Sequence, residues 1–260
     1  MAIVKAIKAH SIKKIGRITA LFLFPLFGSA ILALPAYLLQ ADNQISSLLI
    51  YGGQLLVSLY LIYRWYSFKD CGLGGIPQLS SFLWAFSFLA LRSLTWVIFL
   101  PYRVSLPKWE ILIPDLLFFL FVNAATEEIH FRGLLYSGTL KEISRPVVAA
   151  AISSFLFGLL HLSLGQPSWI PLFIADGLAW CAIRMRTNSV YPAILSHGLQ
   201  NLLFTDILLV PQDLSPSTEI IYTVTAIAVD LVFFQLVGCK NLKQYEQITR
   251  HSRNSRTTDS

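Results

Sequence analysis

The sequence predicts an all-α protein, a bundle of about eight transmembrane helices with both termini in the cytoplasm. Three observations support this fold class. Of the 260 residues, 55% are hydrophobic and only 13% are charged, whereas soluble domains carry about 25% charged residues. Apolar runs long enough to cross a hydrocarbon core of about 30 Å recur along the chain. Lys and Arg gather in alternate connections between those runs.

The apolar runs are separated by polar breaks or by breaks that contain Pro or Gly, and each run is a candidate span. A helix needs about 20 apolar residues to cross the membrane, so the sixth and seventh candidates are short. The expected spans are residues 18–39, 45–63, 82–100, 111–136, 146–164, 170–183, 190–203 and 220–238.

The placement of basic residues predicts the topology, because Lys and Arg are retained on the cytoplasmic side. With the N-terminus inside, only Arg103 and Lys108 fall on the outer side, and Arg92 and Arg132 lie within spans. We therefore expect an integral, multi-pass protein. The membrane we expect is a bacterial plasma membrane.

The chain reads as one membrane domain over residues 1–243, followed by a disordered basic cytoplasmic tail over residues 244–260. The lipid bilayer is thus the first predicted partner. Nucleic acid is not expected as a partner, because the basic residues form no patch interleaved with aromatic residues. The three cysteines lie far apart in the sequence and form no metal-binding spacing.

Charged and polar side chains inside the spans are the candidates for function, because a charge at mid-membrane costs at least about 2.5 kcal/mol. Three clusters stand out, in residues 126–133, 157–161 and 197–201. In the first cluster, Glu128 and Arg132 are four residues apart and are predicted to pair on one helix face, while Glu127 points elsewhere.

The other two clusters supply imidazole and amide groups. His197 and Asn201 share a helix face and can both donate hydrogen bonds to developing negative charge, as in an oxyanion hole. His161 could orient or deprotonate a water molecule together with Glu127. It could instead bind a metal ion such as Zn²⁺ together with Glu127 and His197. The spacing leaves both alternatives open, and no other cofactor is predicted.

The order Glu-Glu-x3-Arg, Phe-x3-His and His-x3-Asn on successive spans resembles the CPBP family of intramembrane proteases. This family includes the Rce1-type CAAX-processing proteases and bacterial Abi proteins. The resemblance covers the core at about residues 111–203. One departure is Asn188, which stands where the family usually has glycine in an Arg-Thr-Gly-Ser turn. Asn tolerates the left-handed backbone that such a turn favours.

The resemblance implies an intramembrane endopeptidase that hydrolyses a peptide bond near the membrane surface. Carried over by position, Glu127 with His161 would activate the attacking water, and His197 with Asn201 would stabilise the oxyanion. Glu128 with Arg132 would hold the shape of the site. The family has also been described as zinc-dependent, so the metal alternative stays open.

The implied substrate is a hydrophobic or lipid-anchored peptide, prenylated in the best-known relatives, and we expect it to approach from the inner side. Two other functions stay open. The titratable groups could form a proton relay in a transporter, or the protein could be a non-catalytic scaffold for lipid-anchored partners.

Four further polar residues in the spans are predicted to be structural. His130 lies between the matched positions and is not expected to be catalytic. For Asp176 and Asp230 we expect interhelical hydrogen bonds to Ser, Thr or backbone groups. Arg92 is predicted either to snorkel toward the interface or to be the counter-ion of one of these aspartates.

Overall fold

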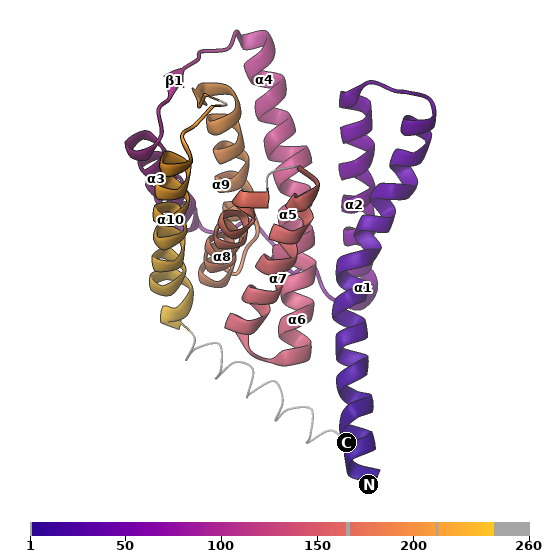
Figure 1. Cartoon of the computed structure of the whole chain (residues 1–260). Helices are drawn as coiled ribbons and strands as arrows, with labels where there is room; N and C mark the ends of the chain where they lie inside the picture. Colours follow the sequence, from indigo (N-terminus) through magenta and orange to yellow (C-terminus); the bar gives the residue numbers. More distant parts are fainter. Residues whose placement is uncertain (1, 165–166, 212, 242–260) are drawn as a thin grey trace.

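The computed structural model describes residues 2–164, 167–211 and 213–241, and these form a bundle of helices (Figure 1). The predicted all-α class is therefore confirmed. The predicted disordered tail, residues 244–260, lies outside the described residues.

Each expected span overlaps a helical segment of the described chain. Five of these segments are long and apolar enough to cross a membrane, and α7 is a shorter apolar helix. The number of spans and the cytoplasmic placement of the termini stay predictions. The helices are α1 (Ala2–Leu38), α2 (Asn43–Trp65), α3 (Phe82–Phe99), the composite helix Trp109–Ile143, α7 (Pro146–Leu160), α8 (Ile170–Thr187), α9 (Tyr191–Leu202) and α10 (Pro216–Phe233).

Helix ends follow local sequence signals. The Asp42 side chain accepts a hydrogen bond of 2.8 Å from the backbone N–H of Ile45 and so caps α2. Ser215 caps α10 in the same way and is followed by proline at the first helical position. Asn188 ends α8 in the left-handed conformation, with φ 54°. It therefore adopts the backbone that a glycine would supply there.

The composite fourth helix contains two π-helical segments that the sequence analysis did not predict. It consists of α4 (Trp109–Leu117), the π-helical turn Phe118–Ala124, α5 (Ala125–Glu128), a second π-helical turn Ile129–Leu135, and α6 (Tyr136–Ile143). π-Helical turns are rare and are frequent at functional sites. Here the two turns flank the Glu127–Glu128 pair.

A short pair of strands is a second feature that was not predicted. Strand β1 (Arg103–Val104) pairs antiparallel with β2 (Leu208–Leu209). The indole N–H of Trp96 donates to the carbonyl of Leu208 at 3.1 Å. The connection after α3 is thereby tied to the end of α9.

The first two helices cross at close range through glycines. A Cβ atom added to Gly28 would lie 2.6 Å from the carbonyl oxygen of Gly53, which is too close for any side chain. Small residues that bring two backbones together in this way are typical of helix packing in membranes. The α1–α2 hairpin is thus one packed unit beside the rest of the bundle (Figure 1).

The segments that carry the predicted inner basic residues lie at one end of the bundle. Arg17 of α1 forms an ion pair of 2.8 Å with Glu142 at the end of α6. Arg184 of α8 donates to the carbonyl of Asp70, in the connection after α2, at 2.8 Å. Figure 1 shows the start of α1 and the end of α10 at this same end. Consecutive helical segments therefore alternate in direction, as the charge pattern requires.

Arg92 is the counter-ion of both buried aspartates, so the expectation of Ser, Thr or backbone partners for them was wrong. Its Nε atom lies 3.1 Å from Asp176 of α8 and 3.7 Å from Asp230 of α10. Its Nη2 group donates to the hydroxyl of Tyr222 at 3.2 Å. This cluster joins α3, α8 and α10 inside the bundle.

Candidate functional site

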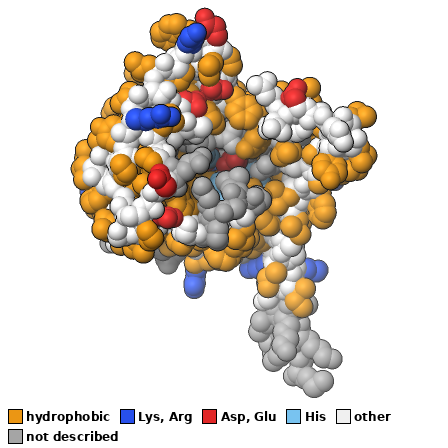
Figure 2. All heavy atoms as spheres, turned by 45° about the horizontal axis from the view of Figure 1, so that its top comes forward, with side chains coloured by type: hydrophobic (Ala, Val, Ile, Leu, Met, Phe, Trp, Pro, Cys, Tyr) orange, Lys and Arg blue, Asp and Glu red, His pale blue; other side chains and the backbone are white. Residues whose placement is uncertain are grey.

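A cavity of about 680 Å³ opens among α1, α2, the fourth helix, α7, α8 and α9. Its volume is within the usual range for ligand sites. Figure 2 shows the bundle hollowed at the end opposite to the basic segments, with acidic and histidine side chains inside the hollow. Four of the predicted site residues line it: Glu127, His161, His197 and Asn201.

His197 lies between the two glutamates. Its Nδ1 atom is 2.9 Å from Glu128 Oε1, and its Nε2 atom is 3.8 Å from Glu127 Oε2. The imidazole is stacked on Trp180 of α8, with ring centroids 4.0 Å apart and an angle of 16° between the planes. Because an ionised carboxylate only accepts hydrogen bonds, Nδ1 carries the proton that it donates to Glu128. The proton is therefore on the nitrogen remote from Glu127.

Glu128 and Arg132 form the ion pair that their spacing predicts. The Nη1–Oε1 distance is 3.0 Å, and both side chains are 0% exposed. The guanidinium also lies over the ring of Phe157, at 4.3 Å from its centroid, and near Trp180. Glu128 thus accepts from Arg132 and from His197 through the same oxygen atom. This arrangement fixes the orientation of the imidazole.

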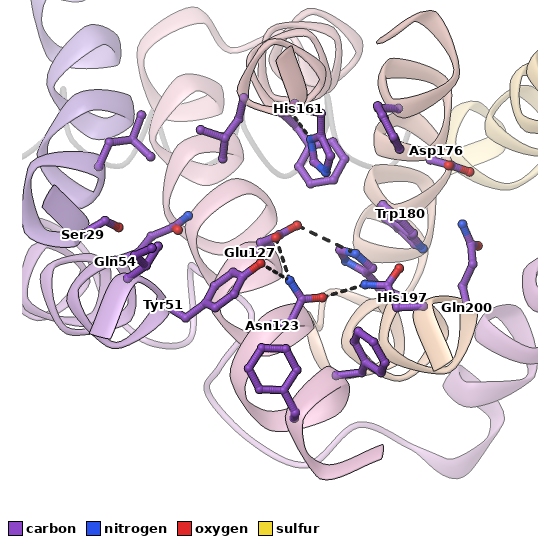
Figure 3. A pocket seen from close by; sticks show the side chains of 18 of the residues that line it. Ser29, Tyr51, Gln54, Asn123, Glu127, His161, Asp176, Trp180, His197 and Gln200 are labelled. Carbon is purple, nitrogen blue, oxygen red and sulfur yellow. Dashed lines mark hydrogen bonds and ion pairs between the residues drawn. The ribbon is translucent and has the colours of Figure 1, made fainter. Parts of the chain in front are cut away.

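Asn123, which was not among the predicted site residues, connects the remaining groups. Its side-chain Nδ2 donates to Glu127 Oε1 at 2.9 Å and to the hydroxyl of Tyr51 at 2.7 Å. Its Oδ1 accepts from Asn201 Nδ2 at 2.6 Å. Figure 3 shows this chain of interactions from Tyr51 to His197 across the cavity. The spacing of four residues between Asn123 and Glu127 was the one signal that could have indicated Asn123.

His161 faces the same cavity but is held by other groups (Figure 3). Its Nδ1 atom bonds to the carbonyl of Phe157 at 2.9 Å, and its ring stacks on Phe173 at 4.4 Å. No hydrogen bond joins it to Glu127 within the described part of the chain. The expected contact between these two residues is therefore not made in this conformation.

The residues that would bind zinc do not form a metal site in this arrangement. Among the described residues, no three His, Cys, Asp or Glu side chains are grouped closely enough to hold a metal ion. His197 already has a glutamate on each side, and His161 is stacked on Phe173. Glu127, His161 and His197 share the cavity without converging on one point.

His130 has a structural environment, in agreement with its exclusion from the predicted site. Gln54 donates to its Nδ1 at 2.8 Å, and its Nε2–H donates to the carbonyl of Leu21 at 3.1 Å. Both ring nitrogens are thereby satisfied while the side chain is fully buried. His130 fastens the α1–α2 hairpin to the fourth helix.

These features define the class of protein, an integral membrane helical bundle with carboxyl, imidazole and amide groups buried around one cavity. Residues 109–203 match the family model described as "Type II CAAX prenyl endopeptidase Rce1-like". The matched segment runs from α4 to the end of α9 and contains all three motifs, so the resemblance is confirmed over this part of the chain. The match supports an intramembrane endopeptidase of the CAAX type in general. No curated protein and no solved structure matches the chain.

Proposed function

We propose that the protein is an intramembrane endopeptidase that hydrolyses a hydrophobic or lipid-anchored peptide in this cavity, with a water molecule activated by Glu127. One observation carries the proposal. Glu127 is buried and lines the cavity, yet its Oε2 atom has no hydrogen-bond partner among the described residues. A carboxylate oxygen without a partner costs free energy unless it serves a purpose, and accepting a proton from water is such a purpose.

In the proposed reaction, Glu127 removes a proton from water as the water oxygen attacks the carbonyl carbon of the scissile bond. Asn123 holds Oε1 of Glu127 and leaves Oε2 as the base. The same carboxyl group then returns the proton to the nitrogen of the leaving amine, so no proton is gained or lost. A general base contributes typically about 10²–10⁴-fold to the rate.

The negative charge on the carbonyl oxygen requires donors. The Nδ2 group of Asn201 has two hydrogens, and among the described residues it gives only one, to Asn123, so the other can serve a ligand. His197 becomes a donor at Nε2 when the imidazole carries a second proton, and Glu128 stabilises that cation through Nδ1. His161 uses Nδ1 for the Phe157 carbonyl, and we assign its Nε2 to positioning the water.

Replacing Glu127 by Gln or Ala tests the proposal. Purified full-length protein in detergent micelles is incubated with a library of fluorogenic prenylated peptides. We expect cleavage by the wild type and loss of at least about 10²-fold in the variants. Glu110→Gln, an exposed acid on the same composite helix, is the matched control and should cleave as the wild type does. Full activity in Glu127→Ala would refute the role of Glu127.

Elemental analysis of the same preparations separates glutamate-activated water from a metal mechanism. The proposal expects cleavage that chelators leave unchanged. Stoichiometric zinc whose removal stops cleavage would instead make Glu127, His161 and His197 ligands, after a rearrangement of the cavity. Absence of cleavage for every peptide would favour the transporter or scaffold alternatives.

A further inference from the structure

The cavity extends beyond the proposed catalytic groups to a second polar region. Asp176 of α8 and Gln200 of α9 both line it, and they are only 3% and 5% exposed. Figure 3 shows them together on the Trp180 side, away from Tyr51. The proposed reaction uses neither residue.

Gln200 has an unsatisfied group in this region. Its Oε1 atom is buried and accepts no hydrogen bond from any described residue. An unpaired buried acceptor costs about 1–3 kcal/mol. The side chain belongs to an otherwise well-packed helix and lines the cavity, so a donor supplied by a ligand would remove this cost.

Asp176 adds a carboxyl group to the same region. Arg92 is shared by Asp176 and Asp230, at 3.1 and 3.7 Å, so the cluster contains one more carboxyl group than guanidinium groups. Asp230 is fully buried behind the cavity wall, whereas Asp176 lines the cavity. Asp176 is therefore the member of this cluster that a ligand can reach.

The rest of the cavity has the same sign of charge. Glu127 also lines it, and none of the described lining residues is Lys or Arg. In Figure 2 both acidic and basic side chains lie around the opening. A low-dielectric cleft lined by one sign of charge concentrates ligands of the opposite sign.

We propose that Asp176 and Gln200 form a specificity subsite that binds the side chain of a Lys or Arg residue in the substrate. The inference rests on the proposed function and names a feature of its substrate. The cationic group donates one hydrogen bond to Gln200 Oε1 and joins Arg92 as a second cationic partner of the two carboxyl groups, Asp176 and Asp230. A C-terminal carboxylate is disfavoured in this region, so the substrate binds here through an internal, basic segment.

Binding is measured without cleavage to test the subsite. The probes are fluorescent lauroylated octapeptides. Each amide that could be cleaved is N-methylated, so that the peptides bind without being hydrolysed. Within a set, one position carries Lys, norleucine or Glu. A second set ends in a carboxylate or a carboxamide. With wild-type protein in micelles we expect one position at which Lys binds at least about 10-fold tighter than norleucine, which is about 1.4 kcal/mol. Glu should bind more weakly than norleucine, and the carboxamide more tightly than the carboxylate.

Two substitutions connect this preference to the two residues. Asp176→Asn should remove most of the preference for Lys. Because that change also affects Arg92, Gln200→Glu serves as a second variant. It should increase the preference for Lys. Both variants are compared with the wild type by size-exclusion chromatography and should elute as it does. Ser29→Ala, on the opposite wall of the cavity, is the matched control and should leave it unchanged.

Equal binding of the Lys and norleucine peptides at every position would overturn the inference. A preference that both variants leave unchanged would overturn it too. Cleavage of the unmethylated peptides is scored separately. A protein that prefers Lys at Asp176 but cleaves nothing would contradict the proposed function alone, whereas one that cleaves without any charge preference would contradict only the subsite.

Discussion

The buried ion pair between Glu128 and Arg132 offers the sharpest test of what holds the site together. Arg132→Met keeps the length of the side chain and leaves a fully buried carboxylate with His197 as its one remaining partner among the described residues. Breaking a buried pair from one side costs about 3–5 kcal/mol, because the other charge stays buried without compensation. Glu128→Gln should cost less, since the guanidinium keeps its contact with Phe157 at 4.3 Å, worth about 1–2 kcal/mol.

The double variant Glu128→Gln/Arg132→Met contains neither charge and should be no less stable than Arg132→Met alone. Unfolding is followed by Trp fluorescence as the mole fraction of SDS in mixed micelles is increased. The exposed pair of Arg17 and Glu142 is the control, and its disruption should cost about 0–1 kcal/mol. Single variants that each cost less than about 1 kcal/mol and whose effects simply add would refute the reasoning.

Two further substitutions probe Asn123 in the cavity and the packing of α9 against the fourth helix. Asn123→Ala removes the hydrogen bonds to Glu127 and Asn201, and we expect kcat to fall by about 10–100-fold, since a hydrogen bond to a charged group is worth about 1.5–3 kcal/mol. Steady-state kinetics on a cleaved peptide measures this, and an unchanged kcat would exclude a role for Asn123 in the reaction. Gly198→Val should lower both the unfolding midpoint and activity, because a Cβ atom there would lie 2.9 Å from the carbonyl oxygen of Phe119. A variant as stable as the wild type would show that α9 does not need this close approach.

The sequence was sufficient for the main architecture because the membrane imposes it. Apolar runs, breaks and basic loops identified the helical segments of the described chain, mostly with ends displaced by a few residues, but α1 begins at Ala2, well before the predicted start at residue 18. The π-helical turns at Phe118–Ala124 and Ile129–Leu135 could not be predicted. They depend on packing against neighbouring helices rather than on the local sequence. The strand pair between Arg103–Val104 and Leu208–Leu209 was missed because two residues give no alternating pattern.

The candidate site was predictable only where its contacts are local. The pairing of Glu128 with Arg132 follows from helical spacing alone. Contacts between helices were not predictable, since residue spacing does not determine which side chains of neighbouring helices meet. His197 and Asn201 line the same cavity, but their partners on the fourth helix, Glu128 and Asn123, did not follow from spacing. Such contacts depend on how α9 lies against the fourth helix.

Two of the sequence predictions disagree about the side of the membrane from which substrate reaches the cavity. Access was expected from the inner side, on the basis of the family resemblance. The cavity opens at the end opposite to the basic segments, and the positive-inside rule assigns that end to the outer side. The topology prediction depends on charges in several independent loops, so it is the better supported of the two. With this topology, a basic peptide would approach the cavity from outside the cytoplasm, and the carboxyl groups of Glu127 and Asp176 that line the cavity complement its charge.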